Sequence, residues 1–217
     1  MNAKFFPLIV SFSFLGSSAG HATITSVPTW SYSGGFYCYA PVLSTDSGTG
    51  AQSLAINGTQ SDFGSMGISI LTDTPTDPTL TINESIQNDS SFNWTGYDLR
   101  VSMDQSFSIN SAGVIAPAGW TATISAPSGP VDGIYTGTID FAGGTPVGME
   151  PGPDSTLDFG YEVTFSGSTQ YSLTETANPV PEPGTFGLLM VGGLLIGGWT
   201  IAKRRNRQSS GAFVNKL

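Results

Sequence analysis

The sequence predicts an all-β protein body, an antiparallel β-sandwich of the Ig-like or jelly-roll-like kind, flanked by an N-terminal signal peptide and a C-terminal transmembrane helix. Three observations predict this class. Short runs of β-branched and aromatic residues alternate with turns rich in Gly, Pro, Asp and Ser. No stretch of the body shows the 3.6-residue period of an amphipathic helix. Only 11% of the residues are charged, and glycine is abundant, a composition typical of exported β proteins.

The first 22 residues have the features of a secretory signal peptide. Lys4 precedes an apolar stretch from Phe5 to Leu15, and small residues follow up to Ala22. The apolar stretch is too short to span a membrane, so we expect cleavage after Ala22. His21, the only histidine of the chain, would leave with this segment.

The body, residues 23–178, is acidic and almost free of cations. It contains fifteen acidic residues against a single basic one, Arg100, which gives a net charge of −14. Proteins that bind nucleic acid present basic surfaces to the phosphates, so a nucleic acid partner is excluded.

Nine segments of the body are predicted to be strands because turn-forming residues separate them. They are residues 22–27, 51–56, 67–72, 80–86, 97–103, 120–125, 133–141, 157–165 and 170–176. In the fourth segment, Leu80, Ile82, Glu84 and Ile86 alternate with polar residues, which predicts a strand with one buried face. The last two segments are expected to form a hairpin that leads directly into the C-terminal region.

The body lacks the residues of most catalytic sites, so no catalytic residue is assigned and the protein is predicted to be no enzyme. A serine or cysteine nucleophile needs a base such as imidazole or lysine, and the mature body has neither. No glycine-rich phosphate-binding loop is found. A pair of carboxylates, as glycoside hydrolases use, remains an alternative because fifteen acids are available.

The single cysteine, Cys38, has no partner for an internal disulfide. We interpret it as a partly buried thiol, with an intermolecular bridge or a lipid attachment as the alternatives.

No metal ligand and no cofactor are assigned, although calcium is a weaker alternative. Several loops carry carboxylate and amide oxygens, which suit a hard cation, but none has the spacing of a calcium-binding loop. The residues concerned are Asp73, Asp77, Asn88, Asp89, Asp154 and Asp158.

The C-terminal region contains three consecutive elements. A linker, residues 179–184, holds Pro181, Glu182 and Pro183, and the two prolines keep its backbone extended. Residues 185–202 are uncharged and, at ~1.5 Å per residue, form a helix just long enough to span a membrane. The basic cluster that follows, residues 203–207, predicts a cytoplasmic C-terminus and a body outside. Its cations are Lys203, Arg204, Arg205 and Arg207.

Together these elements, residues 179–207, resemble the PEP-CTERM sorting signal of Gram-negative bacteria. The matching sequence is "VPEPGT", a Gly/Leu-rich span and "KRRNR"; residues 208–217 add a short cytoplasmic tail. The resemblance implies that an exosortase, a membrane-embedded cysteine transpeptidase, recognises the tail and removes or exchanges it during export. It also implies bacteria that make exopolysaccharide or biofilm, and it leaves the role of the body open.

A second resemblance lies in "NDSSFNWTGYDLRVSM", since a similar passage precedes a strand in some PEP-CTERM proteins. The matching positions are Trp94, Tyr97 and Leu99. We interpret Trp94 and Tyr97 as core residues at the start of a strand, with ligand stacking as the alternative.

The sequence therefore predicts an exported surface or extracellular-matrix protein, anchored transiently in the membrane and sorted by an exosortase. One alternative is a carbohydrate-binding module for exopolysaccharide, which should show an exposed row of aromatic side chains. Another is a glycoside hydrolase, which should show two facing acids in a cleft.

Overall fold

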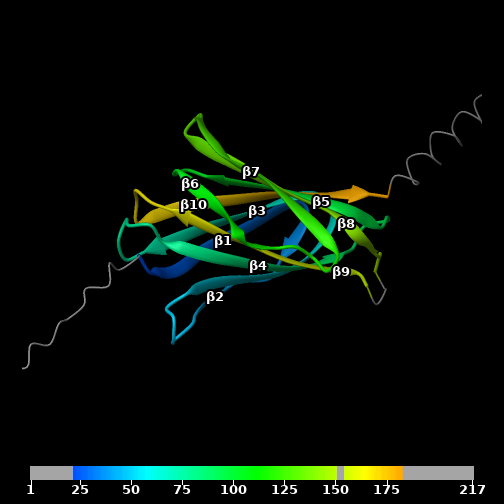
Figure 1. The fold of residues 1–217 in the computed structure, drawn as a ribbon, viewed down its shortest axis with the longest axis horizontal. Coiled ribbons are helices and arrows are strands. Elements are labelled where there is room, and N and C mark those ends of the chain that lie inside the picture. Colours follow the sequence, from blue (N-terminus) through cyan, green and yellow to red (C-terminus); the bar gives the residue numbers. More distant parts are fainter. Residues whose placement is uncertain (1–21, 151–153, 183–217) are drawn as a thin grey trace, which may run out of the picture.

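The computed structural model describes residues 22–150 and 154–182, and every regular element in these ranges is a strand (Figure 1). The predicted signal peptide apart from its last residue, Ala22, the predicted span 185–202 and the basic cluster lie outside the described residues. Within the described residues, no helix has the length and apolar character needed to cross a membrane. The prediction of an all-β body is confirmed.

Ten strands form the fold, and all nine predicted segments lie within them except for one or two residues at their ends. Segments 51–56 and 67–72 belong to a single long strand, and two strands, β2 and β6, were not predicted from the sequence. The strands are β1 (Ile24–Cys38), β2 (Val42–Thr45), β3 (Gln52–Thr72), β4 (Thr79–Asn88), β5 (Trp94–Met103), β6 (Phe107–Ile115), β7 (Trp120–Val131), β8 (Ile134–Val147), β9 (Thr156–Phe165) and β10 (Gln170–Pro181).

Strand β3 sets the architecture because its two halves belong to opposite layers. Residues 52–60 pair with β4, whereas residues 64–71 pair with β10, and the exposed residues between them form the corner. The two ends of β3 lie close together, because both contact Ile24 of β1. The Gln52 side chain bonds both backbone polar groups of Ile24, at 2.5 and 2.7 Å, and Ile24 pairs with Thr72.

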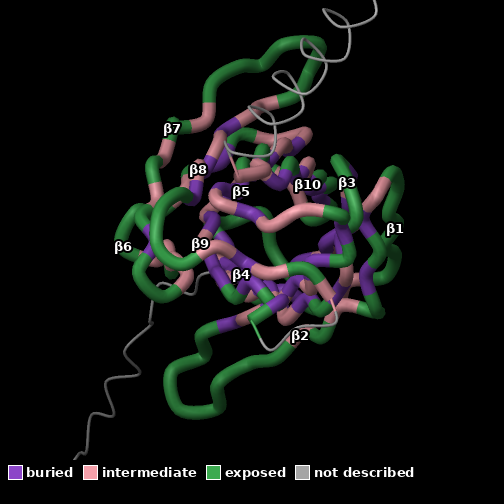
Figure 2. Tube along the Cα trace, turned by 90° about the vertical axis from the view of Figure 1, so that its right-hand side faces the viewer, coloured by how far each residue is buried: buried purple, intermediate pink, exposed green. Residues whose placement is uncertain are grey.

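This fold-over makes the sheet mixed, so the prediction of a purely antiparallel sandwich is wrong for one pair. The strand order is β6-β9-β4-β3-β10-β5-β8-β7, with β1 and β2 paired to β3. Because β3 ends near its own start, the short connection 73–78 begins β4 beside the first half of β3, and the two run parallel. The sheet wraps into a flattened, nearly closed barrel around one two-layered core (Figure 2).

Strand β1 turns the same corner and lies at the outer edge beside β3. Its residues 24–34 pair with the second half of β3, and residues 36–38 pair with the first half. Gly34 has a φ of 68°, which favours glycine, and a Cβ on Gly64 opposite it would lie 2.5 Å from the backbone nitrogen of Phe36. The close approach of the two strands at the corner therefore requires glycine.

The expected final hairpin is not formed. Strand β9 pairs with β4 and β6, while β10 pairs with β3 and β5. Both strands bury alternate side chains, so they face each other across the core, with the Phe165 and Tyr171 ring centroids 4.5 Å apart. The two strands lie in different layers because each has an apolar face to cover.

The interior is rich in aromatic side chains. Figure 2 shows where the buried residues lie along the strands. Trp94 and Tyr97 are fully buried, which confirms their interpretation as core residues. Ring contacts continue from Trp94 through Tyr97 and Phe159 to Phe141, at centroid distances of 5.7, 5.3 and 5.0 Å. These contacts join β5, β9 and β8 across the two layers.

Candidate functional sites

The first part of the predicted sorting motif lies at the end of β10. Pro181 is the last residue of that strand and pairs with Trp94 of β5, after a register shift at Val180. The strand thus continues past the predicted body boundary at residue 178 into the predicted linker. Pro183 and the basic residues Lys203, Arg204, Arg205 and Arg207 lie outside the described residues.

Glu182 is held against the folded body by one residue, Asn93. The Glu182 backbone N–H donates to the Asn93 carbonyl oxygen at 3.2 Å, and Asn93 Nδ2 donates to Glu182 Oε1 at 3.1 Å. One step earlier, Thr95 Oγ1 donates to the Pro181 carbonyl oxygen at 3.3 Å. The sequence did not indicate these contacts, because Asn93 is 89 positions away from Glu182.

A row of exposed aromatic side chains follows β1 and its C-terminal extension. Trp30, Tyr32, Tyr37 and Tyr39 are 44–60% exposed. The Tyr37 ring makes edge-to-face contacts with Tyr32, at 4.8 Å, and with Tyr39, at 5.5 Å. The bend at residues 34–35 brings Tyr32 and Tyr37 together. No residue from Thr23 to Thr45 carries a charge, so this surface is apolar and hydroxyl-rich.

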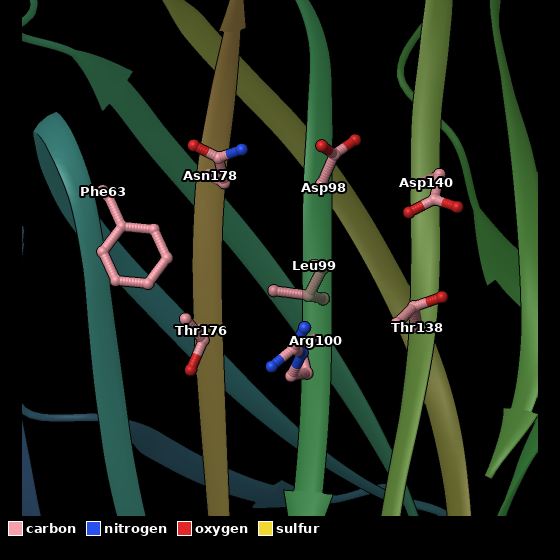
Figure 3. A pocket seen from close by; sticks show the side chains of 8 residues that line it. All are labelled: Phe63, Asp98, Leu99, Arg100, Thr138, Asp140, Thr176 and Asn178. Atoms are coloured by element: carbon pink, nitrogen blue, oxygen red, sulfur yellow. The ribbon is translucent and has the colours of Figure 1, made fainter. Parts of the chain in front are cut away.

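A shallow depression of about 320 Å³ lies on the outer face of β10, β5 and β8, beside the corner of β3 (Figure 3). Asp98 lies between Asn178 on one neighbouring strand and Asp140 on the other. Burial raises the pKa of Asp98, and the Asp140 charge raises it further, whereas a hydrogen bond with Asn178 lowers it. Arg100 and the exposed ring of Phe63 complete a mixed polar lining.

Two acids also meet inside the protein, but in the core. Glu84 of β4 and Glu175 of β10 are 3% and 2% exposed and share a hydrogen bond, and Tyr161 donates to Glu175 Oε1. Burial and the Glu175 charge raise the pKa of Glu84 well above its usual value. Burial also raises the pKa of Glu175, although its two hydrogen bonds oppose the rise. The hydrogen bond between the two carboxyl groups therefore holds a shared proton.

Both side chains of this pair are almost completely removed from solvent. Glu84 Oε1 is buried without a hydrogen-bond partner among the described residues, so the core tolerates one unpaired acceptor. The pair therefore lacks the solvent-accessible arrangement expected of a glycoside hydrolase.

Cys38 lies in the same interior, and its interpretation as a buried thiol agrees with its 2% exposure. Burial raises the pKa of the thiol to about 11, with smaller contributions from Glu175 and Glu84. Such a thiol is a weak nucleophile at neutral pH.

The loop acids suggested as calcium ligands do not gather in the described ranges. No three His, Cys, Asp or Glu side chains there are placed to hold one metal ion. Asp73 accepts a hydrogen bond from the Thr23 backbone at 2.7 Å, and the Asn88 side chain bonds the loop before β5. Calcium binding stays the weaker alternative to the prediction that no metal is bound.

The comparisons with known proteins match the C-terminal region of the chain. Residues 179–205 match the family model described as the PEP-CTERM protein-sorting motif. Searches of the curated proteins and of the solved structures found no match. The matched residues begin inside β10 and include Pro181 and Glu182, so the motif starts on the folded body. The chain therefore carries a PEP-CTERM sorting motif, a signal of exported proteins that an exosortase recognises.

Proposed function

We propose that this chain is a non-enzymatic surface or extracellular-matrix protein, exported through the inner membrane and processed by an exosortase at its C-terminal motif. One observation carries the proposal: the sorting motif begins inside β10, the last strand of the described residues. A basic cluster after a span at 185–202 holds the C-terminus in the cytoplasm and the body in the periplasm until processing.

The chemistry of the body supports a non-enzymatic role. The mature body has no histidine or lysine, and its one thiol is buried with a raised pKa. The hydrogen-bonded acid pair, Glu84 and Glu175, is buried in the core. These side chains serve the fold rather than a reaction.

The test is the mass and location of the protein in cells with and without an active exosortase. With the enzyme, we expect a shorter protein at the cell surface or in the matrix; without it, an intact protein in the membrane fraction. An identical mass and location in both strains would refute exosortase processing.

A second function is favoured by the row Trp30, Tyr32, Tyr37 and Tyr39, which we propose binds a neutral polysaccharide. Aromatic rings stack on the apolar faces of sugars, and Trp30 and Tyr32 lie two residues apart on the same face of β1. The net negative charge of the body would repel an anionic polymer, and segment 23–45 has no cation to bind one, so a neutral polymer is favoured.

Affinity electrophoresis in gels that contain neutral or anionic polysaccharides tests this second function. A Tyr37→Ala, Tyr39→Ala variant should lose retardation by the neutral polymer. The control is Val131→Ala, which truncates a 73% exposed apolar side chain at the β7–β8 turn and should migrate as wild type. If the tyrosine variant changes only the oligomeric state, the row is a contact between copies of the chain.

A further inference from the structure

The backbone N–H and the carboxylate of Glu182, the glutamate of the sorting motif, already make hydrogen bonds in the folded protein. Asn93 accepts a hydrogen bond from the Glu182 backbone N–H and donates one to its carboxylate. The carbonyl of Pro181 accepts from Thr95, and Pro181 has no N–H to offer. An enzyme that binds an extended peptide uses these same backbone and side-chain groups.

Asn93 belongs to a loop that is firmly attached to the core. Asn88 Nδ2 donates to the Phe92 carbonyl at 2.9 Å, and Ser90 Oγ donates to Asn88 Oδ1 at 2.6 Å. The fully buried Trp94 donates from Nε1 to Ser90 Oγ at 3.1 Å. Asn93 is therefore preorganised to hold Glu182 without rearrangement of the loop.

The strand end that carries Glu182 is, by contrast, easily detached. The register of β10 on β5 shifts between Val180 and Pro181, and both residues are only partly buried. Strand ends with few buried contacts open at a small free-energy cost compared with global unfolding. The body can thus remain folded while Pro181 and Glu182 leave β5.

We propose that Asn93 is a positioning residue that masks the sorting motif, so that exosortase binding requires the end of β10 to separate from β5. This inference rests on the proposed function, because it assumes that Glu182 is the recognised group. Processing then competes with the contact between Asn93 and Glu182, and the folded body sets the rate at which its own tail is removed.

The test measures the rate of tail removal in cells that contain the exosortase. The full chain carries an epitope tag after Leu217, and loss of the tag is followed by pulse-chase and immunoblotting. Asn93→Ala should accelerate the loss about tenfold, the equivalent of one hydrogen bond to a charged group. Asn93→Asp should accelerate it further, because two carboxylates repel. The matched control is Asn57→Ala, which truncates an exposed asparagine in β3 and should leave the rate unchanged.

A second variant keeps the test independent of the Asn93 loop. Thr95→Val removes the bond to the Pro181 carbonyl and should accelerate tag loss about fivefold, the value of one neutral hydrogen bond. Slower processing in Asn93→Ala and Thr95→Val would overturn the proposal and show that the body presents the motif. An unchanged rate in both would also overturn it.

Amide hydrogen exchange separates this inference from the proposed function. It is measured on the intact protein purified from a strain without exosortase, so it does not depend on recognition. Asn93→Ala should raise exchange at Glu182 and leave β9 protected. Normal processing of Glu182→Ala would show that the glutamate is not the recognised group, and the proposed role of the motif would then fail. The exchange experiment would still decide whether Asn93 holds Glu182. Unchanged exchange at Glu182 in Asn93→Ala would refute the mask itself.

Discussion

The glutamates of the body differ in burial and in hydrogen bonding. This difference distinguishes a carboxyl group that stabilises the core from one that lies within reach of another protein. Glu84 and Glu175 are sealed in the core, bonded to each other and to Tyr161. Glu182 lies at the end of β10, partly exposed, bonded only through Asn93 among the described contacts. Burial makes the first arrangement costly to disturb, whereas the second opens without loss of the fold.

The largest expected effect is loss of stability when the core pair is broken. Glu175→Ala leaves Glu84 and the Tyr161 hydroxyl without their shared partner and creates a cavity, so we expect a loss of about 3–5 kcal/mol in unfolding free energy. Urea unfolding of the purified protein measures it. Glu162→Ala, which removes a surface carboxylate bonded to Asn110, is the control and should cost less than about 1 kcal/mol. Equal losses in the two variants would contradict a structural role for the core pair.

The reactivity of Cys38 should report how well the interior is sealed. A rise of its pKa from 9.0 to about 11 lowers the thiolate population at pH 8 about a hundredfold. Iodoacetamide should therefore label Cys38 at least a hundredfold more slowly in the folded protein than in urea, as mass spectrometry would measure. Equal labelling rates would mean that the core opens readily.

The shared proton of the core pair predicts how stability depends on pH. Because the folded-state pKa of Glu84 is raised above its ordinary value of 4.5, the folded protein keeps a proton that the unfolded chain releases. Stability is complete below that value and falls as pH rises toward the raised pKa, by up to about 1.4 kcal/mol per pH unit. Melting temperatures at pH 5 and pH 8 should differ in wild type and differ less in Glu84→Gln. An equal fall in melting temperature between pH 5 and pH 8 in wild type and in Glu84→Gln would show that the proton is not held by the core pair.

The smallest expected effect on stability is that of the contact at the strand end. Asn93→Ala removes a hydrogen bond to a partly exposed carboxylate, so the unfolding free energy should fall by only about 1.4 kcal/mol or less. Urea unfolding under the conditions used for Glu175→Ala measures it. A loss as large as that of Glu175→Ala would mean that the end of β10 is part of the cooperative fold.

Local sequence patterns predicted the strands but not how they pair. Alternation in residues 80–86 indicated the buried face of β4 correctly, including Glu84, because a strand has a two-residue period. The fold-over of β3 at residues 61–63 was not predictable, since its two halves look like separate strands. The final hairpin was wrong because proximity along the chain does not say which layer a strand joins.

The candidate sites show the same division. The sorting motif was recognised because its residues are consecutive, whereas Asn93, the partner of Glu182, is brought to it only by the pairing of β5 with β10. The aromatic row had a visible signal in "TWSYSGGFYCYAP", where aromatic residues cluster in an uncharged segment. Their exposure became evident only with β1 at the edge of the sheet.

The central claim, that Glu182 in its Pro-Glu-Pro setting is what the exosortase recognises, is tested most directly by Glu182→Ala with both prolines kept. The carboxylate gives the enzyme a charged acceptor on an extended peptide, and the prolines preserve that backbone. A tag after Leu217 is followed by protease protection and immunoblotting. Replacement of Arg204, Arg205 and Arg207 by Ser is the contrasting variant and should disturb orientation instead. We expect the Glu182→Ala protein to stay correctly oriented in the membrane fraction with its tag attached; normal tag removal would contradict the account.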